Sequence, residues 1–237
     1  MKKVILLVMM AAVSLIGYAA QPIFNHLGAN VGVGTTGISV ELATPITNFV
    51  QMRAGVSIMP GITFNADADV NYTVMGQHRT STAELTGDLG RVQGQVIFNI
   101  YPATTRIPLY VAVGAYFGAN DLLKITGHSD ELQAQGGGDV VIGDYTIPVD
   151  ANGNVDGGIR VNNFRPYVGL GWGRAVPGKL LNFSIDLGVQ IHGTPKLYTN
   201  NGVIKTSDID DNNTFNKIMD MVKVYPTLTF RLGFRAF

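Results

Sequence analysis

The sequence predicts an all-β fold, a transmembrane antiparallel β-barrel of eight strands with long extracellular loops. Three observations support this prediction. Segments of about ten residues alternate between apolar and polar side chains, as in Leu181–Ile191, which reads L-N-F-S-I-D-L-G-V-Q-I. A secretory leader precedes these segments, and the chain contains no cysteine. Membrane-spanning barrels need strands of this kind, with apolar side chains toward lipid and polar side chains toward the lumen.

The first 19 residues have the features of a signal peptide. Lys2 and Lys3 form a basic start, and the apolar stretch Val4–Ile16 follows. This stretch is too short to span a bilayer as a helix. Small residues then surround a cleavage point after Ala19, with Ala20 as the alternative. We expect residues 20–237 to form one barrel domain.

Composition excludes several function classes. Removing the two leader lysines from the 17 Lys+Arg leaves 15 against 17 Asp+Glu, a formal charge of −2. A nucleic-acid partner would require a basic surface, so none is expected. The absence of cysteine excludes disulfides, thiol catalysis and zinc–thiolate sites. Only 14% of residues are charged, and 29 are glycine, as expected for a wall that faces lipid outside and a narrow lumen inside.

Eight strands follow in order along the mature chain. They are Ala29–Gly34, Gly37–Ala43, Phe49–Met59, Asp88–Tyr101, Ile107–Gly118, Phe164–Arg174, Leu181–Ile191 and Lys223–Phe237. The first is short, and from the third strand onward every second residue is mainly apolar. The predicted lipid-facing residues in those strands are Val50, Met52, Ala54, Val56 and Ile58; Val92, Val96, Phe98 and Ile100; Ile107, Leu109, Val111, Val113 and Phe117; Val168, Leu170 and Trp172; Leu181, Phe183, Ile185, Leu187, Val189 and Ile191; and Val224, Leu228, Phe230, Leu232 and Phe234.

The connections alternate in length. The short ones are Thr44–Asn48, Pro102–Arg106 and Ala175–Leu180, and the long ones are Pro60–Gly87, Ala119–Asn163 and His192–Val222. Outer-membrane barrels have short periplasmic turns and long outer loops. We therefore expect an outer-membrane location with the long connections outside the cell. The first outer connection, Thr35-Thr36, is an exception because it is very short.

Local structure is expected within the long connections. Asp150–Asn154 and the segment Asn200-Asn201-Gly202 carry hairpin-turn signals. Thr214–Val222 has the apolar spacing of a helix. Such a helix would pack on the barrel rim, or alternatively bind the membrane surface or a partner.

Two motifs mimic ligand sites. Gly32–Gly37 matches G-x-G-x-x-G, but a strand pattern rather than a helix follows it, so a tight turn is predicted instead of a dinucleotide site. Asp150–Val161 resembles the start of a calcium loop. Its glycine stands at the fourth position rather than the sixth, and its twelfth position is Val161 rather than glutamate, so a plain turn is favoured.

No catalytic or metal site is expected, and neither is a cofactor. The four histidines, His26, His78, His128 and His192, stand singly, and no two have the spacing of metal ligands. A barrel hydrolase would need a histidine near a carboxylate or serine. His192 near Asp186 or Ser184 is the only candidate of that kind.

Six charged residues are predicted to point into the lumen. They are Glu41, Arg53, Arg91, Asp186, Arg231 and Arg235. Counted from the short turns, Glu41 and Arg53 lie at similar depth on neighbouring strands, and so do Asp186 and Arg231, so both pairs can form ion pairs. The charges would either plug and rigidify the barrel or line a path for a zwitterionic or cationic solute. The plug is favoured because the arginines outnumber the carboxylates and would repel a basic solute.

The last strand ends at Phe237, an aromatic residue of the kind that commonly ends outer-membrane barrels. Its phase is opposite to that of Phe230, Leu232 and Phe234 unless a bulge intervenes. This strand is the expected contact with the barrel-assembly machinery. The other expected partner is outer-membrane lipid, and a monomer is expected.

Several motifs together resemble the CarO-type family of small Gram-negative outer-membrane barrels. They are Gly34–Gly37 (G-T-T-G), Leu109–Tyr116 (L-Y-V-A-V-G-A-Y), Arg165–Gly173 (R-P-Y-V-G-L-G-W-G), Gly193–Leu197 (G-T-P-K-L) and Val224–Pro226 (V-Y-P). The resemblance implies an eight-stranded outer-membrane barrel. The role proposed for that family is the passage of small basic amino acids such as ornithine and of carbapenem drugs.

The predicted function is that of an outer-membrane barrel with a structural role or a role in slow diffusion of small solutes, amino acids among them. The alternative is binding of a ligand, a surface or a partner by the outer loops on a closed barrel. Eight strands leave an interior that side chains nearly fill, so an open aqueous channel is not expected.

Overall fold

The computed structural model describes residues 26–236, except residues 75–76, 103–106, 135, 137, 143–144, 179, 200–204 and 207–222. The predicted signal peptide, the Asn200–Gly202 turn, the Thr214–Val222 helix and Phe237 all lie outside the described residues. Within the described part of the chain, no helix has the length and apolar character needed to cross a membrane.

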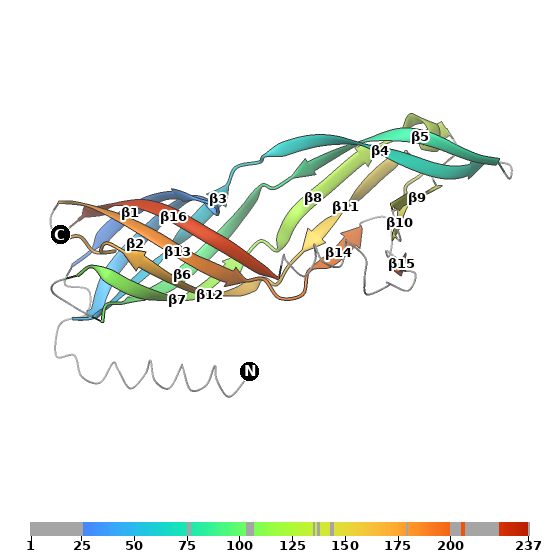
Figure 1. Ribbon diagram of the computed structural model, residues 1–237. Coiled ribbons are helices and arrows are strands. Elements are labelled where there is room, and N and C mark those ends of the chain that lie inside the picture. Colours follow the sequence, from blue (N-terminus) through green and yellow to red (C-terminus); the bar gives the residue numbers. More distant parts are fainter. Residues whose placement is uncertain are drawn as a thin grey trace.

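Eight strands close into an antiparallel barrel, as predicted (Figure 1). Around the barrel the order is β1 (Gly28–Gly34), β16 (Val224–Arg235), β13 (Leu181–Ile191), β12 (Phe164–Trp172), β7 (Leu109–Gly118), β6 (Arg91–Ile100), β3 (Val50–Met59) and β2 (Gly37–Thr47). Pairing of β1 with both β2 and β16 closes the ring, so the barrel has no free edge. Closure pairs the backbone polar groups internally, which a strand in lipid requires.

Alternation along the strands separates a polar lumen from an apolar outer wall. In β12 buried and exposed residues alternate at every position. The outward-facing residues are large and apolar, and they remain well exposed in the isolated chain. On the barrel they include Val31, Val33, Ile38, Val40, Leu42, Val56, Ile58, Val92, Phe98, Leu109, Val111, Phe117, Phe164, Val168, Leu170, Trp172, Leu181, Phe183, Leu187, Ile191, Val224, Phe230, Leu232 and Phe234. This is the wall that a lipid bilayer covers.

The two ends of the barrel differ. At one end, here called the turn end, lie the β2–β3, β6–β7 and β12–β13 turns together with the end of β16 (Figure 1). At the other end, the loop end, β1 and β2 are joined through Thr35-Thr36, and the long connections leave the barrel. The tight turn predicted for Gly32–Gly37 is present there, because strands flank it on both sides.

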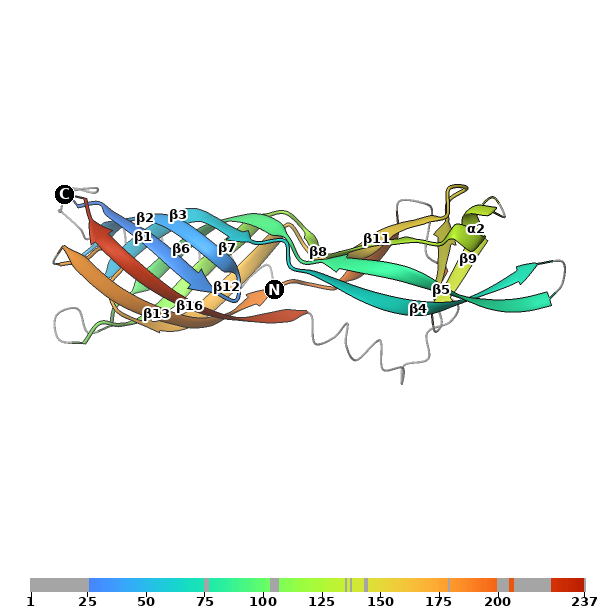
Figure 2. The same cartoon turned by 90° about the horizontal axis from the view of Figure 1, so that it is seen from above.

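A second sheet projects from the loop end. It has five strands in the order β14 (Lys196–Thr199), β11 (Asn154–Arg160), β8 (Asp121–His128), β5 (Gln77–Asp88) and β4 (Thr63–Val74), and we call it the projecting sheet. Each strand continues a barrel strand: β14 follows β13, β11 leads into β12, β8 follows β7, β5 leads into β6, and β4 follows β3. The projecting sheet therefore repeats the order of five barrel strands and extends the barrel wall along its length (Figure 2).

Two smaller elements accompany the projecting sheet. One is a three-stranded sheet of β15 (Lys205–Thr206), β10 (Tyr145–Val149) and β9 (Gly138–Ile142). The other is the short helix α2 (Asp130–Ala134), with Leu132 buried beneath it. The turn predicted at Asp150–Asn154 is confirmed: the Asp150 carboxylate accepts the N–H groups of Asn152 and Asn154 at 2.9 and 2.7 Å.

The sequence analysis did not predict the strands of the projecting sheet. A signal was present in β4, where Phe64, Ala66 and Ala68 alternate with Asn65 and Asp67. Two small alanines weaken the contrast between the two faces. When the apolar residues that alternate with polar ones are small, the pattern is weak evidence for a β-strand.

Candidate functional site

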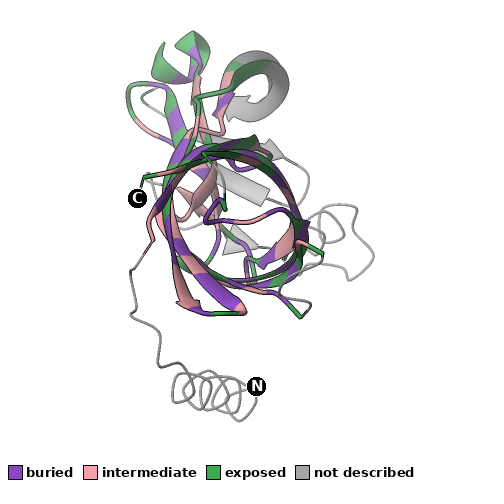
Figure 3. Ribbon diagram, turned by 90° about the vertical axis from the view of Figure 1, so that its left-hand side faces the viewer, coloured by how far each residue is buried: buried purple, intermediate pink, exposed green. Residues whose placement is uncertain are grey.

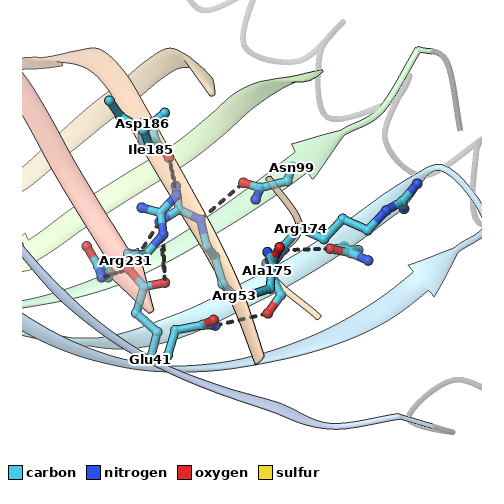
Figure 4. A network of polar contacts seen from close by, with 12 residues as sticks. Glu41, Arg53, Asn99, Arg174, Ala175, Ile185, Asp186 and Arg231 are labelled. Carbon is cyan, nitrogen blue, oxygen red and sulfur yellow. Dashed lines mark hydrogen bonds and ion pairs between the residues drawn. The ribbon is translucent and has the colours of Figure 1, made fainter. Parts of the chain in front are cut away.

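The middle of the lumen holds four charged residues from four strands (Figure 4). Glu41 of β2 accepts a hydrogen bond from Arg53 of β3, with Arg53 Nη1 at 3.1 Å from Glu41 Oε1. Arg231 of β16 and Asp186 of β13 form a second ion pair, with 2.9 Å between Nη2 and Oδ2. Arg53 Nη2 also donates to Asp186 Oδ2 and so joins the two pairs. We call these four residues the mid-lumen network.

The contact between Arg53 and Asp186 crosses the lumen. In the ring of eight strands, β3 and β13 are separated by three strands on either side, so they lie on opposite walls. The side chains of all four network residues are 1–2% exposed. The network contains two cations and two carboxylates, and it therefore carries no net charge. Buried charges are tolerated when they are paired in this way.

Polar neighbours complete the hydrogen bonding of the network. Asp186 accepts from the hydroxyl groups of Tyr167 and Tyr110, the latter at 3.2 Å. Gln95 Nε2 donates to Glu41 Oε1 at 2.6 Å, and Arg53 Nε donates to Asn99 Oδ1 at 3.1 Å. These contacts hold each charged group in one place and fill the cross-section of the barrel.

Glycines make room for the tyrosine rings. A Cβ atom at Gly171 would overlap the ring of Tyr110, and one at Gly188 would overlap the ring of Tyr167. The glycine-rich inner faces of β12 and β13 thus allow two large rings to lie flat against the wall in a narrow lumen. This gives a physical reason for the high glycine content.

A turn closes the lumen at the turn end. The β12–β13 connection, residues 174–178, folds inward, and Ala175 and Val176 are buried (Figure 3). Gln51 Oε1 accepts the N–H groups of Ala175 and Val176 at 2.9 and 3.1 Å, and the hydroxyl of Tyr101 at 3.0 Å. Asn30 Nδ2 donates to the carbonyl oxygen of Ala175 at 3.1 Å. We call this inward segment the turn plug.

Two further arginines occupy the loop end of the lumen, which we call the neck. Arg165 of β12 donates through Nη1 to the carbonyl oxygens of Ala119 and Asn162 at 2.8 and 3.1 Å, and through Nη2 to Gln93 Oε1 at 3.0 Å. The guanidinium of Arg91 lies 5.1 Å from the ring centre of Tyr225. The neck is thus cationic, in contrast to the neutral mid-lumen network.

The structure brings together four of the six charged residues that the sequence analysis placed in the lumen. Both expected pairs are present, Glu41 with Arg53 and Asp186 with Arg231. The other two lie apart: Arg91 is in the neck, and Arg235 is half-buried at the turn end, where its Nη2 lies 3.0 Å from His26 Nδ1.

Three features of the lumen were not predicted: the cross-lumen contact, the turn plug and the role of Arg165. Arg165 could have been found, because the alternation that turns Tyr167 and Gly169 inward also turns Arg165 inward.

The pairing of His192 with Asp186 that a hydrolase could use is not formed. The Asp186 carboxylate contacts Arg53, Arg231, Tyr110 and Tyr167 rather than His192. The ring of His192 instead stacks on Tyr225, with centroids 5.2 Å apart and an interplanar angle of 12°. Among the described residues, no group of three His, Asp or Glu side chains could hold a metal ion.

No protein-family model matches the chain, and no curated protein matches its sequence. Among solved structures, the crystal structure of CarO2 from Acinetobacter baumannii is similar, with a TM-score of 0.52 and 22% identity, over 91% of this chain and 100% of that one. The crystal structure of CarO from the same organism matches with a TM-score of 0.49 and 23% identity, over 90% of this chain and 99% of that one.

The similarity to CarO2, at this level of identity, concerns the fold. It confirms the CarO-type fold that the sequence motifs predicted, a transmembrane antiparallel barrel of eight strands. Function has to be argued from the lumen and the projecting sheet, because a fold alone does not determine what a protein does.

Proposed function

We propose that this chain is an outer-membrane barrel with a structural role, or a role in slow diffusion of small solutes, and that its lumen is closed at rest. The observation that carries the proposal is the cross-lumen contact of Arg53 with Asp186 within the mid-lumen network. The turn plug and the neck close the same lumen at its two ends. An eight-stranded barrel has little interior space beyond its own side chains, so a closed lumen is the expected state.

Location and orientation follow from the leader and the loops. We infer that the turn end faces the periplasm and the projecting sheet faces the cell exterior, because outer-membrane barrels place long connections outside. The apolar wall contacts outer-membrane lipid, and the last strand is the contact for the barrel-assembly machinery. We propose a monomer without enzymatic activity, cofactor or nucleic-acid partner.

Charge limits which solute could pass slowly. The mid-lumen network is neutral, whereas the neck contributes Arg91 and Arg165. A positive constriction repels cations and attracts anions. Any slow diffusion through this barrel should therefore favour neutral or anionic solutes over basic amino acids.

Planar-bilayer conductance of the refolded protein tests the closed lumen. We expect no steady channels from the natural sequence. The double variant Arg53→Ser with Asp186→Ser removes both sides of the cross-lumen contact without changing the net charge, and it should conduct. Arg160→Gln, which alters an arginine of the projecting sheet, is the control and should remain silent. Steady channels from the natural protein would contradict the proposal.

One observation favours the alternative, ligand binding outside the barrel. The projecting sheet has a polar pocket of about 580 Å³, lined by Glu84, Thr86, Thr126, Gly127, His128, Ser129, Asp130 and Glu131. The NMR signals of the His128 imidazole report on this pocket. A solute that shifts them saturably would support loop-mediated binding, and the absence of any such solute would favour the structural role.

A further inference from the structure

The neck buries two arginines that have no carboxylate partner among the described residues. The exposed fraction is 1% for Arg165 and 9% for Arg91. Within the part of the chain that the structure describes, neither arginine forms an ion pair. Arg53 and Arg231 are also buried, at 1% and 2% exposed, yet each has a carboxylate partner. A buried guanidinium without a counter-charge is costly, so the neck is a place where an anion would be stabilised.

The unused hydrogen-bonding groups of the neck are mainly donors. Among the buried side-chain nitrogens that have no hydrogen-bond partner in the described residues, four lie in the neck or next to it: Arg91 Nη2, Arg165 Nε, Gln93 Nε2 and, on β13 opposite Tyr225 in register, Gln190 Nε2. The Gln190 side-chain oxygen is unpartnered as well, and Gln190 is fully buried. Four N–H donors around two positive charges match an acceptor-rich anion rather than a cation.

Three contacts hold the donors in position before any ligand binds. Arg165 is fixed by its bonds to two carbonyl oxygens and to Gln93 Oε1. Because an arginine can only donate, Gln93 must present its oxygen to Arg165, and its amide nitrogen is left for another partner. Arg165 of β12 and Gln93 of β6 are therefore held in place without a ligand.

One carboxylate and one imidazole border the neck. Asp121 lines the same cavity, but its Oδ1 accepts from Arg160 Nε at 2.6 Å. His192 also lines it, stacked on Tyr225. The cavity is contracted and does not admit a water-sized sphere. Arg91 lines it too, and its guanidinium lies 5.1 Å from the ring centre of Tyr225, so a ligand requires this side chain to shift.

We propose that the neck is a binding site for a small oxyanion of the phosphate or sulfate class, one per chain, held by Arg91 and Arg165 with Gln93 and Gln190. Guanidinium groups bind such oxyanions through charge-assisted and often bidentate hydrogen bonds. The site stands whether or not the barrel conducts, because it depends on the buried charges alone.

Equilibrium dialysis of the refolded full-length protein against radiolabelled inorganic phosphate, at constant ionic strength, tests the proposal. We expect saturable binding of one phosphate per chain. Arg91→Gln and Arg165→Gln should each weaken binding by roughly tenfold or more, while Lys124→Gln, at an exposed lysine of β8, should change it by less than about twofold. Heat-modifiable gel mobility identifies the variants that fold.

Gln190→Leu provides a second variant in case Arg165→Gln does not fold. The Gln190 side chain makes no hydrogen bond in the described structure, so replacing it breaks none. Leucine has a similar volume and lacks the N–H donor. The substitution should leave folding intact and weaken phosphate binding. The proposal is overturned if the natural protein shows no saturable binding, if folded Arg91→Gln and Gln190→Leu bind as well as the natural protein, or if chloride competes as strongly as sulfate.

Discussion

The middle of the lumen and the neck contain the same number of buried arginines but differ in how the charge is balanced. In the middle, Arg53 and Arg231 meet two carboxylates within hydrogen-bond distance. In the neck, Arg91 and Arg165 meet carbonyl oxygens, an amide and an aromatic ring. The mid-lumen arginines are balanced by carboxylates, whereas the neck arginines have no carboxylate partner among the residues that the structure describes. The difference separates a structural charge cluster from a candidate binding site in the same lumen.

The largest effect is expected from the carboxylate that serves both mid-lumen arginines. Asp186→Ala should lower the free energy of unfolding by about 3–5 kcal/mol, because it removes the close partner of Arg231 and leaves two buried guanidinium groups with one carboxylate, Glu41. Asp156→Ala, at an exposed aspartate of β11, should change it by less than about 0.5 kcal/mol. Urea unfolding in lipid vesicles measures both values.

The same Asp186 variant separates a plug from a transport path. If the network is structural, Asp186→Ala should not reduce solute uptake in a liposome-swelling assay. Unchanged stability together with abolished uptake would show that these charges serve transport. The mid-lumen network would then not be a structural cluster that differs in role from the neck.

A smaller effect of opposite sign is expected in the neck. Arg91→Met removes an unpaired buried charge, so in buffer without oxyanions the free energy of unfolding should stay constant or rise by about 1 kcal/mol. Arg53→Met makes the same replacement in the mid-lumen network and should lower it by about 3–5 kcal/mol, because it leaves two buried carboxylates with Arg231 as their one remaining cation in the network. If Arg91→Met and Arg53→Met lowered the free energy of unfolding equally, the distinction between unpaired neck arginines and paired mid-lumen arginines would be wrong.

Much of the barrel could be predicted from the sequence because membrane strands obey a strict two-residue period. β13 has the predicted bounds, and the expected cross-strand pairs Glu41–Arg53 and Asp186–Arg231 are present. Both pairs join neighbouring strands, whose register can be counted from a short turn.

Contacts across the lumen could not be predicted in this way. Arg53 and Asp186 are 133 residues apart and belong to opposite walls, so their distance depends on the diameter and shear of the closed barrel. The turn plug was equally inaccessible, because Ala175 and Val176 are held by backbone N–H groups that leave no mark in the sequence. The neck could not be predicted for the same reasons, because Arg165 contacts backbone carbonyl oxygens and side chains from different strands meet there.

The smallest effect is expected in the projecting sheet, where a charged pair lies in solvent. His128 Nδ1 lies 2.9 Å from Asn154 Oδ1, and Nε2 lies 3.0 Å from Asp130 Oδ1. These hydrogen bonds, first to Asn154 and then to Asp130, raise the pKa of His128 above its ordinary value of 6.5. A raised pKa in the folded state means that the contribution to stability is complete below the pKa of the unfolded chain and is lost as the pH rises through the folded pKa.

Asp130→Asn should therefore lower the pKa of His128, measured from the imidazole signals by NMR, whereas Asp156→Asn on the neighbouring β11 should leave it unchanged. Because the His128 side chain is 47% exposed and that of Asp130 is 91% exposed, water screens the pair, and removing its carboxylate should leave the free energy of unfolding nearly constant. Loss of one carboxylate in the lumen should lower the free energy of unfolding, whereas the same loss in the projecting sheet should change only the pKa of His128. A large loss of stability in Asp130→Asn would mean that burial does not distinguish the two regions, and the reasoning applied to the neck would fail with it.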